Sequence, residues 1–350
     1  MHPNVPHLRF PEFHGEWEKC KLGDIATLTK GSGISKDQRS ATGTPCILYG
    51  ELYTTYKSEV INYVVSKTDI SDKNLVRSCA NDIIIPSSGE TAIDISTARC
   101  VLSPDVLLGG DLNIIRLKDG DGRFFSYQLN GVRKHDIAKI AQGVSVVHLY
   151  GESIKGLTVS FPSNKEQQKI STLLSLIDER IATQSKLIED LKKLKSAIIE
   201  KLYSEIQGKE YSYRQLFEII NERNNRLEFS NVLSASQERG MVSREDLNLD
   251  IKFERSNINT YKIVRNGDYV IHLRSFQGGF AFSDIVGVCS PAYTIMRPKD
   301  LLEYGYLSYY FTSRQFIKSL VIVTYGIRDG RSINVDEWFD MKIVIPTKEQ

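Results

Sequence analysis

Two segments, one near the middle of the chain and one at its end, nearly repeat each other. The first is SIKGLTVSFPSNKEQQKI at residues 153–170, and the second is EWFDMKIVIPTKEQ at residues 337–350. Aligning Pro162 with Pro346 places apolar residues on apolar residues through the preceding run, at an offset of about 184 residues. That offset is far longer than a solenoid repeat, so we expect two copies of a whole domain. A repeated domain lets one chain contact two places at once.

The length and charge of the chain fit two ordinary domains. Its 350 residues, 41% of them hydrophobic, suit two domains of about 150 residues that can each bury a core. Lys and Arg total 45 and Asp and Glu total 43, for a formal net charge of +2. This balance excludes an acidic DNA mimic and a histone-like polycation. It is compatible with sequence-specific DNA binding through a local basic patch.

The cysteines and the apolar runs indicate a cellular compartment. Five scattered cysteines without a C-x-x-C pair predict reduced thiols: Cys20, Cys46, Cys79, Cys100 and Cys289. The N-terminal residues contain no apolar run of signal-peptide length, and no stretch approaches the roughly 20 apolar residues of a membrane span. We therefore expect a cytoplasmic protein with no membrane partner.

The first half, residues 1–164, is predicted to be a β-rich domain. Leu22, Ile25 and Leu28 predict a short amphipathic helix that ends at Gly31. A longer helix is predicted at residues 124–141. Short runs rich in β-branched residues, bounded by Gly, Pro, Asn or Asp, predict strands at 45–50, 81–86, 112–117 and 156–162.

The second half, residues 208–346, repeats this order. A helix is predicted at 213–223 and another at 304–320. Strands are predicted from runs that match those of the first half, at 266–273, 290–298 and 340–346. The middles of the halves, at about 31–110 and 230–290, barely resemble each other. A shared frame with unlike middles indicates one scaffold that carries two different recognition surfaces.

Residues 165–207, between the halves, contain neither Gly nor Pro, and they predict one long helix. Apolar residues recur in it at spacings of three and four, as in a coiled coil, and Lys and Glu occupy the other faces. The residues of this apolar stripe are Ile170, Leu174, Ile177, Ile181, Ile188, Leu191, Leu194, Ile198 and Leu202. The helix would be about 60 Å long. Ser163 or Asn164 can cap it, with Glu166 or Gln167 in its first turn.

An apolar stripe of this length needs a partner. One alternative is that the helix packs on its own domain. The other is an antiparallel partner helix. The second repeat should supply such a helix after Pro346, and residues 347–350 would be its start. Either this sequence is truncated there or the partner comes from another chain, which includes self-association through the helix.

The order of these segments resembles the specificity subunit of type I restriction-modification enzymes. The similarity covers essentially the whole chain. It rests on LRFPEFHGEWEKCKLGDI at residues 8–25, GTPCILYGEL at 43–52, NDIIIPSSGET at 81–91, and the doubled segment that precedes the long helix. The fold class expected from the resemblance is α+β, with two similar target-recognition domains joined by a long coiled-coil helix and the second spacer helix missing.

The resemblance also implies function and partners. Each target-recognition domain would read one half of a split double-stranded DNA sequence, and two antiparallel helices would set the distance between them. Two methyltransferase subunits would bind this scaffold, and a restriction subunit would join them. S-adenosylmethionine would belong to the methyltransferase subunit, with no cofactor in this chain. The missing distal helix is a departure from the family pattern.

Sequence motifs for catalysis are absent, which argues for a non-catalytic subunit. There is no amino-methyltransferase motif, no phosphate-binding loop, and no metal-binding spacing among the six histidines. The adjacent Asp178 and Glu179 are better explained as a solvated helix face than as a catalytic pair. Two alternatives remain. One is a nuclease or methyltransferase with an atypical site, and the other is a coiled-coil scaffold or inhibitor without sequence-specific DNA binding.

Polar side chains on loops of a rigid scaffold are the usual means of contacting DNA. Three loops of the first half qualify, at residues 29–39, 86–96 and 141–151, and Lys30, Lys36 and Arg39 are suited to phosphates. The candidates in these loops are Lys30, Ser32, Lys36, Arg39, Ser87, Ser88, Glu90, Gln142, Ser145 and His148. Each loop could instead be an ordinary turn with solvated charges.

Two loops of the second half, at residues 272–280 and 324–334, are richer in such side chains. Arg pairs well with guanine and Gln with adenine, at about 1–3 kcal/mol of discrimination each. The candidates are Arg274, Ser275, Gln277, Tyr325, Arg328 and Arg331. The loop at 324–334 aligns with the first-half loop at 141–151.

Overall fold

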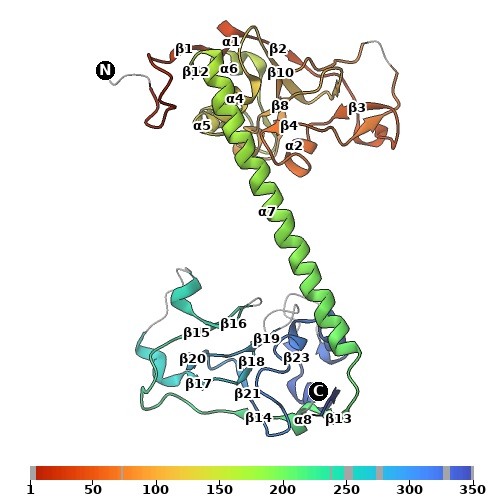
Figure 1. Cartoon of the computed structure of the whole chain (residues 1–350), viewed down its shortest axis with the longest axis vertical. Coiled ribbons are helices and arrows are strands. Elements are labelled where there is room, and N and C mark those ends of the chain that lie inside the picture. Colours follow the sequence, from red (N-terminus) through yellow and green to blue (C-terminus); the bar gives the residue numbers. More distant parts are fainter. Residues whose placement is uncertain are drawn as a thin grey trace. The chain divides into compact units, whose positions relative to one another are not determined.

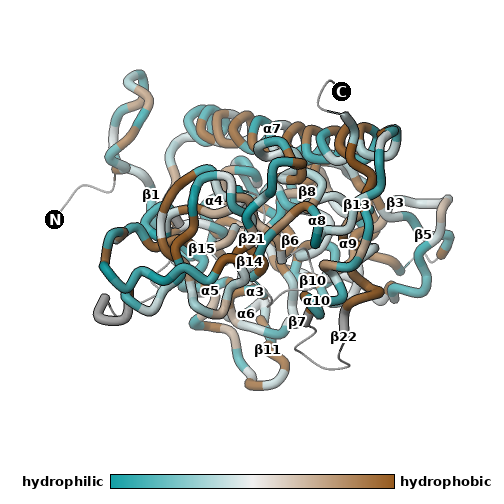
Figure 2. The backbone as a smooth tube through the Cα atoms, turned by 90° about the horizontal axis from the view of Figure 1, so that it is seen from below, coloured by the Kyte–Doolittle hydropathy of each residue, from teal (hydrophilic) through white to brown (hydrophobic). Residues whose placement is uncertain are grey.

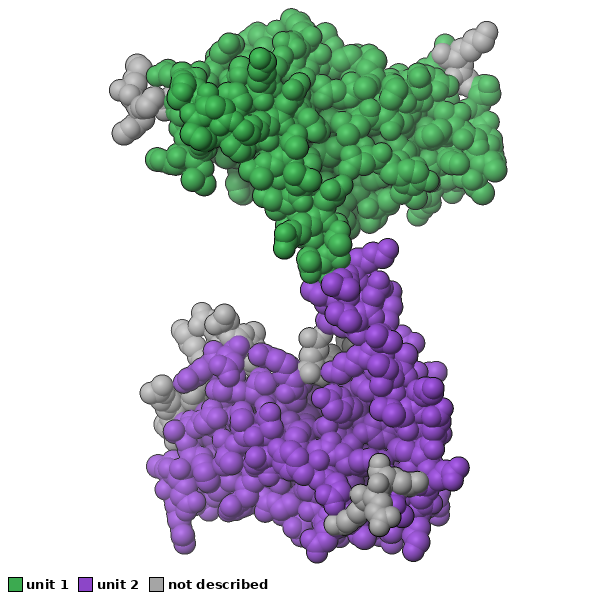
Figure 3. All heavy atoms as spheres, viewed as in Figure 1, with its two compact units in different colours: residues 1–185 green, residues 186–350 purple. Residues whose placement is uncertain are grey.

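The structure is a computed structural model, and it describes residues 5–71, 74–236, 239–247, 255–272, 279–325 and 332–347. The chain divides into two compact units, residues 1–185 and 186–350 (Figure 3). The division falls within the long helix α7 (Asn164–Ser204), which is drawn in green in Figure 1. The fold is mixed α+β with this helix between two β-rich domains, as the sequence predicts.

A five-stranded sheet forms the centre of the first unit. Its order is β2-β10-β6-β8-β4, and all neighbouring pairs are antiparallel except β8 with β4. The strands are β2 (Ala26–Lys30), β10 (Leu112–Leu117), β6 (Asp82–Pro86), β8 (Arg99–Val101) and β4 (Val60–Ile61). The predicted strands at 81–86 and 112–117 are therefore confirmed as the central pair.

Alternation along the central strands separates two cores, because successive side chains of a strand point to opposite faces. Ile83 and Ile85 pack with Phe124 and Phe125 of α4, whereas Ile84 packs in a second cluster on the other face. The helices on the first face are α1 (Leu22–Ile25), α3 (Ala92–Ile95), α4 (Gly122–Asn130), α5 (Lys134–Ile140) and α6 (Gly151–Lys155). The second face is covered by α2 (Glu51–Thr54), β3 (Thr44–Ile47) and β9 (Leu107–Leu108).

Short elements complete the first unit. The strand β1 (Glu18–Lys21) pairs with β12 (Thr158–Phe161), so both ends of the first half meet just before α7 begins. The predicted closing strand at 156–162 is thus confirmed. The remaining elements are η1 (Lys36–Gln38), β5 (Lys67–Thr68), β7 (Ser88–Gly89) and β11 (Val147–His148).

The second unit is built on a four-stranded sheet of order β14-β21-β18-β19. These strands are β14 (Phe217–Ile220), β21 (Thr294–Pro298), β18 (Tyr269–Ile271) and β19 (Phe280–Phe282). The pair β13 (Lys209–Ser212) and β24 (Lys342–Ile345) takes the place of β1 and β12. The other elements are α8 (Tyr213–Leu216), β15 (Leu233–Ser236), β16 (Gly240–Ser243), η2 (Arg244–Leu247), η3 (Arg255–Thr260), β17 (Lys262–Val264), β20 (Gly287–Cys289), η4 (Tyr310–Thr312), α9 (Arg314–Ser319), η5 (Leu320–Val323), β22 (Thr324–Tyr325), β23 (Ser332–Ile333) and α10 (Val335–Asp340).

The duplication extends to individual backbone hydrogen bonds. Leu22 N donates to Leu157 O at 2.8 Å, and in the second unit Tyr213 N donates to Met341 O at 3.1 Å. Leu157 and Met341 are the residues that the sequence repeat aligns. In the same way Lys118 N donates to Ile25 O and Lys299 N to Leu216 O, both at 2.8 Å. The two units therefore share one frame.

A buried carboxylate paired with an arginine recurs in the same place in both frames. In the first unit Asp82, at the start of β6, accepts two bonds from Arg116 of β10, at 2.8 and 2.7 Å. In the second unit Asp268, just before β18, accepts two bonds from Arg297 of β21, at 2.9 and 3.0 Å. Each aspartate is almost fully buried, so each pair ties together the two central strands of its sheet.

Three predicted helices are wrong in extent. The chain forms one helical turn at α1 and one at α8, and then extends into β2 and β14. Local apolar spacing permits a helix there, but pairing with the central strands β10 and β21 decides the outcome. The segment 304–320 consists of turns, two 3₁₀ segments and the short α9. The helix predicted at 124–141 is confirmed as α4 and α5, interrupted at Gly131.

Buried polar contacts hold the first turns of α7 in the first unit. Glu166 is buried and accepts two bonds from the N-terminal Arg9, each at 2.7 Å. Gln167 accepts from Asp121 N at 3.0 Å and donates to Pro162 O at 2.8 Å. Ser171 donates to the Asp121 carboxylate at 2.7 Å. The first turn is thus fixed by side chains of the domain that precedes it.

The last turns of α7 are held in the second unit by aromatic contacts. The Tyr203 ring lies 5.7 Å from that of Tyr306 and 5.1 Å from that of Tyr310, and its hydroxyl donates to Tyr306 O. Lys195 lies over the Tyr309 ring at 5.0 Å. Burial among these rings raises the pKa of Tyr203 to about 12, so its hydroxyl stays protonated and keeps donating.

The apolar stripe of α7 is largely exposed, and its residues recur between hydrophilic ones along the helix (Figure 2). Ile170 is half-buried against the first core, and Leu174 is also half-buried. The other stripe residues are 46–63% exposed: Ile177, Ile181, Ile188, Leu191, Leu194, Ile198 and Leu202. The alternative in which the helix covers its stripe on its own domain is therefore wrong.

Asp178, two turns farther along α7 than Ser171, also contacts the first unit. Asp178 accepts hydrogen bonds from Tyr127 Oη at 2.7 Å and from Ser58 Oγ at 3.3 Å. The prediction that Asp178 lies on a solvated helix face is therefore wrong. The Glu59 carboxyl lies beside it and accepts from Asn130 at 3.4 Å. Burial, with a smaller contribution from Asp178, raises the pKa of Glu59 above its usual range, against the opposing effect of Arg99.

This raised pKa predicts how stability depends on pH. Between the ordinary glutamate pKa and the raised one, the unfolded chain releases the Glu59 proton and the folded chain keeps it. Stability contributed by this site is therefore lost as pH rises through that window. The Glu59→Gln variant lacks this ionisable group and keeps its stability as pH rises. Its unfolding free energy minus that of wild type should therefore increase from pH 4 to pH 7 in urea titrations. A difference that does not vary with pH would contradict the assignment.

Candidate nucleic-acid interface

Two of the candidate loops start at the same end of the central sheet of the first unit. Both β2 and β6 run antiparallel to β10, with Asn113 opposite Lys30 and Leu112 opposite Pro86. The carboxyl ends of β2 and β6 therefore lie together where β10 begins. The loops at 29–39 and 86–96 both leave the sheet from this end.

The third loop, at 141–151, is a hairpin joined to the second. Gln142 and His148 exchange backbone hydrogen bonds of 2.9 and 2.7 Å, which close the hairpin. Its strand β11 pairs with β7, with His148 opposite Ser88, and Leu149 N donates to Ser87 O at 3.0 Å. All three predicted loops thus form one surface at one end of the sheet.

The individual candidates in the first unit differ in exposure. Exposed side chains are Lys30, Lys36, Arg39, Glu90, Gln142, Ser145 and His148. Ser88 is half-buried. Ser87 is buried, and the half-buried Ser32 accepts from Val76 N at 2.7 Å. Ser32 and Ser87 therefore shape the loops, while the exposed set is available to a ligand.

Sequence analysis missed the apolar tip of the hairpin. Val144 is 96% exposed, and Val146 and Tyr150 are also exposed. Gly143, just before the tip, has φ +121°, and a Cβ atom there would lie 2.1 Å from Val146 O. Glycine is required at this position because other residues rarely adopt such a φ. An apolar run in a predicted loop, directly after a glycine, was the available signal.

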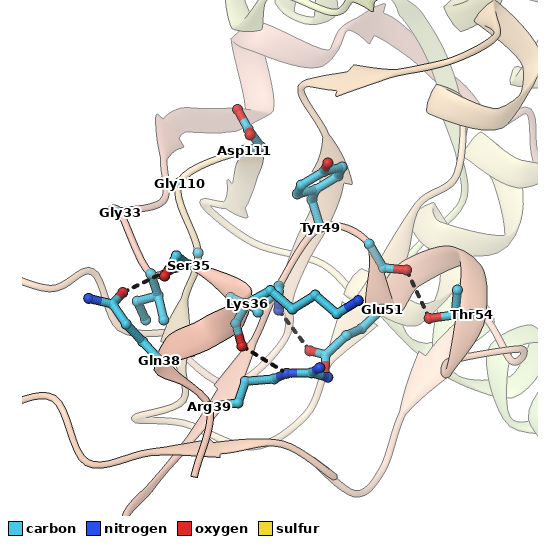
Figure 4. Close-up of a pocket in the computed structure, with 14 residues that line it drawn as sticks. Gly33, Ser35, Lys36, Gln38, Arg39, Tyr49, Glu51, Thr54, Gly110 and Asp111 are labelled. Carbon is cyan, nitrogen blue, oxygen red and sulfur yellow. Dashed lines mark hydrogen bonds and ion pairs between the residues drawn. The ribbon is translucent and has the colours of Figure 1, made fainter.

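A cleft of about 860 Å³ lies beside these loops in the first unit (Figure 4). Figure 4 shows Lys36 and Arg39 extending side by side toward Glu51 and Thr54, with Tyr49 and Asp111 on the other side. Of these, only Lys36 and Arg39 were among the sequence candidates, and Tyr49, Glu51, Thr54 and Asp111 were not. Asp111 O accepts from Ser87 N at 2.8 Å, so the cleft adjoins the loop at 86–96.

The second unit has the same strand arrangement. Both β14 and β18 run antiparallel to β21, and their ends Ile220 and Ile271 lie opposite Ile295 and Thr294. The strands β22 and β23 pair as a hairpin, with Tyr325 opposite Ser332. Five candidates lie outside the described residues: Arg274, Ser275, Gln277, Arg328 and Arg331.

His272 is a polar residue of this sheet end that sequence analysis did not single out. It directly follows β18 and is half-buried, with its ring 6.0 Å from that of Tyr293. Burial lowers the pKa of His272 below its usual value. The ring is therefore neutral near pH 7, with one nitrogen that donates and one that accepts a hydrogen bond.

Other chemistries lack support within the described part of the chain. No group of three or more His, Cys, Asp or Glu residues there could hold a metal ion. All five cysteines are unpaired, and burial raises the pKa of Cys46 to about 11, which keeps that thiol unreactive. None of the described helices combines the length and the apolarity needed to cross a bilayer.

Comparison with protein families gives a match over residues 14–193, about half of the chain, to the type I restriction modification DNA specificity domain. A relative, the type I restriction enzyme MjaVIII specificity subunit of Methanocaldococcus jannaschii, is 25% identical over 203 residues. That alignment covers 56% of this chain and 45% of the relative. The chain spans about half the length of the curated relatives it matches.

Two solved structures share the fold. The S subunit of a type I restriction-modification system from Mycoplasma genitalium matches with a TM-score of 0.60 and 17% identity, over 98% of this chain and 87% of that one. A chain from a study of complex assembly and conformational transition of the type I system matches with a TM-score of 0.51 and 13% identity. That match covers 98% of this chain and 88% of the other.

A pair of glycines in the first loop tests how closely this surface is packed. A Cβ atom on Gly31 would lie 1.9 Å from Gly109 O, whereas one on Gly33 would meet nothing within 4 Å. Gly31→Ala should therefore cost about 1–3 kcal/mol of stability, because backbone must move to admit the methyl group. Gly33→Ala should change it by less than about 1 kcal/mol. Urea unfolding of both variants measures this, and equal effects would disprove the packing at Gly31.

Proposed function

The chain belongs to the type I restriction-modification DNA specificity domain family, and from this we propose that it is the DNA-recognition subunit of such a system. The observation that carries the proposal is a strand arrangement at one end of the central sheet that both units share. In both units the corresponding strands finish together at one end of the sheet, and the first unit's loops present exposed polar side chains there. A rigid frame with polar loops at one end is a suitable scaffold for contacting base edges.

The target is proposed to be bipartite. Residues 1–164 and 208–346 are the two target-recognition domains, and each reads one half of a split site. Their frames match down to the paired aspartate and arginine, whereas their middles differ in sequence. Equal frames with unlike loops support two different half-sites, because base readout depends on the side chains of the loops.

Roles for single residues follow from chemistry and exposure. Lys30 and Lys36 are exposed cations suited to phosphates. Exposed polar side chains suited to base edges in the first unit are Glu90, Gln142, Ser145 and His148, with Ser88 beside them. In the second domain the proposed contacts are Arg274, Ser275, Gln277, Tyr325, Arg328 and Arg331, from sequence alone.

The helix α7 is proposed to carry the protein partners. An exposed apolar stripe with spacings of three and four suits a coiled-coil partner helix. In this proposal two methyltransferase subunits assemble on the scaffold, a restriction subunit joins them, and the chain itself performs no catalysis. S-adenosylmethionine would bind the methyltransferase subunits.

A second candidate function is a coiled-coil scaffold or inhibitor that binds no specific DNA sequence. The same exposed stripe favours it. The two functions differ in one measurable respect. The recognition subunit gives its complex a sequence preference, whereas the scaffold self-associates through α7 and gives none.

The experiment that tests the function is a methylome. The chain is co-expressed with its modification subunit in a host without DNA methylation, and the native DNA is sequenced for modified bases. A single split motif with a fixed gap is the expected result. Methylation without any sequence preference, or its absence although the two proteins co-purify and the modification subunit binds S-adenosylmethionine, would count against a recognition role.

The second-domain loop provides a sharper test of base readout. Arg274→Ala and Gln277→Ala should each relax one half of the motif and leave the other half unchanged. Losing a bidentate base contact removes about 1–3 kcal/mol of discrimination. The measurement is the methylated motif of each variant. An equal loss of methylation on all sequences would reject base readout by these side chains.

The stripe of α7 predicts the site of protein association. Ile181→Glu combined with Ile188→Glu places charges on two exposed stripe positions, so folding should be retained and association lost. Ala182→Glu combined with Thr183→Glu adds the same two charges at exposed positions off the stripe and is the matched control. Light scattering and co-purification with the modification subunit give the readout. If both pairs of substitutions act alike, the stripe is not the contact.

A further inference from the structure

We propose that Arg39 recognises a guanine of the first half-site from within the cleft of the first unit, and that Glu51 positions it. The inference rests on the proposed DNA-recognition function and assigns a ligand to one site. The sequence pattern alone suggested a phosphate contact for Arg39. The environment of its guanidinium in the folded unit favours a base.

The cleft lies at the sheet end that carries the candidate interface. One wall is the segment Gly109–Asp111, which leads directly into β10. Gly31, at the end of β2, approaches Gly109 so closely that no side chain fits between them. Asp111 O accepts from Ser87 N in the next loop. A DNA duplex on this surface would therefore also face the cleft.

Glu51 is a buried carboxylate with its oxygens occupied. Its Oε2 accepts from Leu48 N at 2.8 Å, and its Oε1 accepts from the Ser66 hydroxyl. Arg39 Nη1 lies 3.7 Å from the same Oε1. The Glu51 side chain is 5% exposed and is held by two other groups, so it cannot move when a ligand binds. It therefore holds the Arg39 guanidinium in a fixed position.

Arg39 is held on a second side and still has free donors. Its Nε donates to Lys36 O at 3.3 Å, within the turn η1. The guanidinium has five N–H donors in a planar fork, these two contacts involve its Nε and Nη1, and the residue lines the cleft. A fixed planar fork matches the O6 and N7 acceptors of guanine, which lie side by side in the major groove.

The charge of the cleft argues for a base rather than a phosphate. Its charged lining residues are two cations, Lys36 and Arg39, and two carboxylates, Glu51 and Asp111. Their formal charges cancel, so the cleft is not a general anion trap. The edge of a G·C pair presents both acceptors and a donor, since the cytosine amino group can donate to a carboxylate such as that of Asp111. Tyr49 adds an aromatic wall that a base can contact.

The first variant is Arg39→Lys, which keeps the charge and removes the fork. Arg39 is exposed, so the fold should tolerate this change. The matched control is Arg77→Lys, an exposed arginine of the same unit. Arg77 O accepts a hydrogen bond from Arg116, which lies near the end of β10. The cleft adjoins the start of β10, so Arg77 lies toward the opposite end of the sheet. Glu51→Gln tests the positioning role, with its thermal melt recorded alongside because the residue is buried.

The assay uses the wild-type motif from the methylome. Binding of the complex is measured on duplexes in which each guanine of the first half-site is replaced in turn by 7-deazaguanine, which lacks the N7 acceptor. For wild type, one such replacement should weaken binding. Arg39→Lys should lower discrimination at that position by about 5- to 150-fold, as expected for a bidentate contact, and leave the second half-site unchanged.

Each alternative outcome overturns the assignment. A first half-site without guanine, or 7-deazaguanine effects that are equal in wild type and Arg39→Lys, excludes base recognition by Arg39. For Arg39→Gln, which removes the charge, an unchanged sequence preference with a smaller salt dependence would identify a phosphate contact. If Glu51→Gln melts like wild type and keeps full discrimination, its positioning role is excluded. A wild-type complex without any split motif would instead be a failure of the proposed function itself.

Discussion

In each unit a buried aspartate binds an arginine of the neighbouring strand, in the pairs Asp82–Arg116 and Asp268–Arg297, and this contact fixes the two central strands to each other. Each aspartate also accepts a hydrogen bond from the backbone N–H of the residue three positions before it. Cys79 N donates to Asp82 at 2.7 Å, and Arg265 N donates to Asp268 at 2.8 Å. A buried carboxylate left without its arginine would be costly, so strand register at this end has little freedom. The opposite end of the same strands carries the candidate loops. Variation of those loops can therefore proceed without disturbing the sheet, and this is the property that a changeable recognition surface needs.

Much of the frame could be predicted from the sequence because its signals are local. The runs DIIIP and LNIIRL are strands on composition alone, and α7 follows from the apolar spacing between Ile170 and Leu202 in a segment without Gly or Pro. The helix predicted at 213–223 failed for a different reason. The segment Phe217–Ile220 has apolar spacing that fits a helix, but its backbone pairs with β21. Such pairing joins residues about eighty positions apart, and no local pattern contains it.

The candidate site could likewise be predicted from the sequence only in part. Loops at 29–39, 86–96 and 141–151 could be named from their polar composition. Their convergence could not, because it depends on the antiparallel register of β2, β10 and β6 and on the short pairing of β7 with β11. Glu51 was missed since a single glutamate after a strand has no distinctive spacing. Its significance lies in burial and in the three groups that surround it, which tertiary structure alone supplies.

The two ends of α7 are held by side chains that leave most of its apolar stripe uncovered. Glu166, Gln167 and Ser171 form hydrogen bonds with the first unit. In the second unit Tyr203 packs against the rings of Tyr306 and Tyr310, and its hydroxyl donates to Tyr306 O. From Ile177 to Leu202 the stripe residues remain about half exposed or more. A partner helix on the stripe would therefore add contacts to α7 without competing with those that hold its two ends.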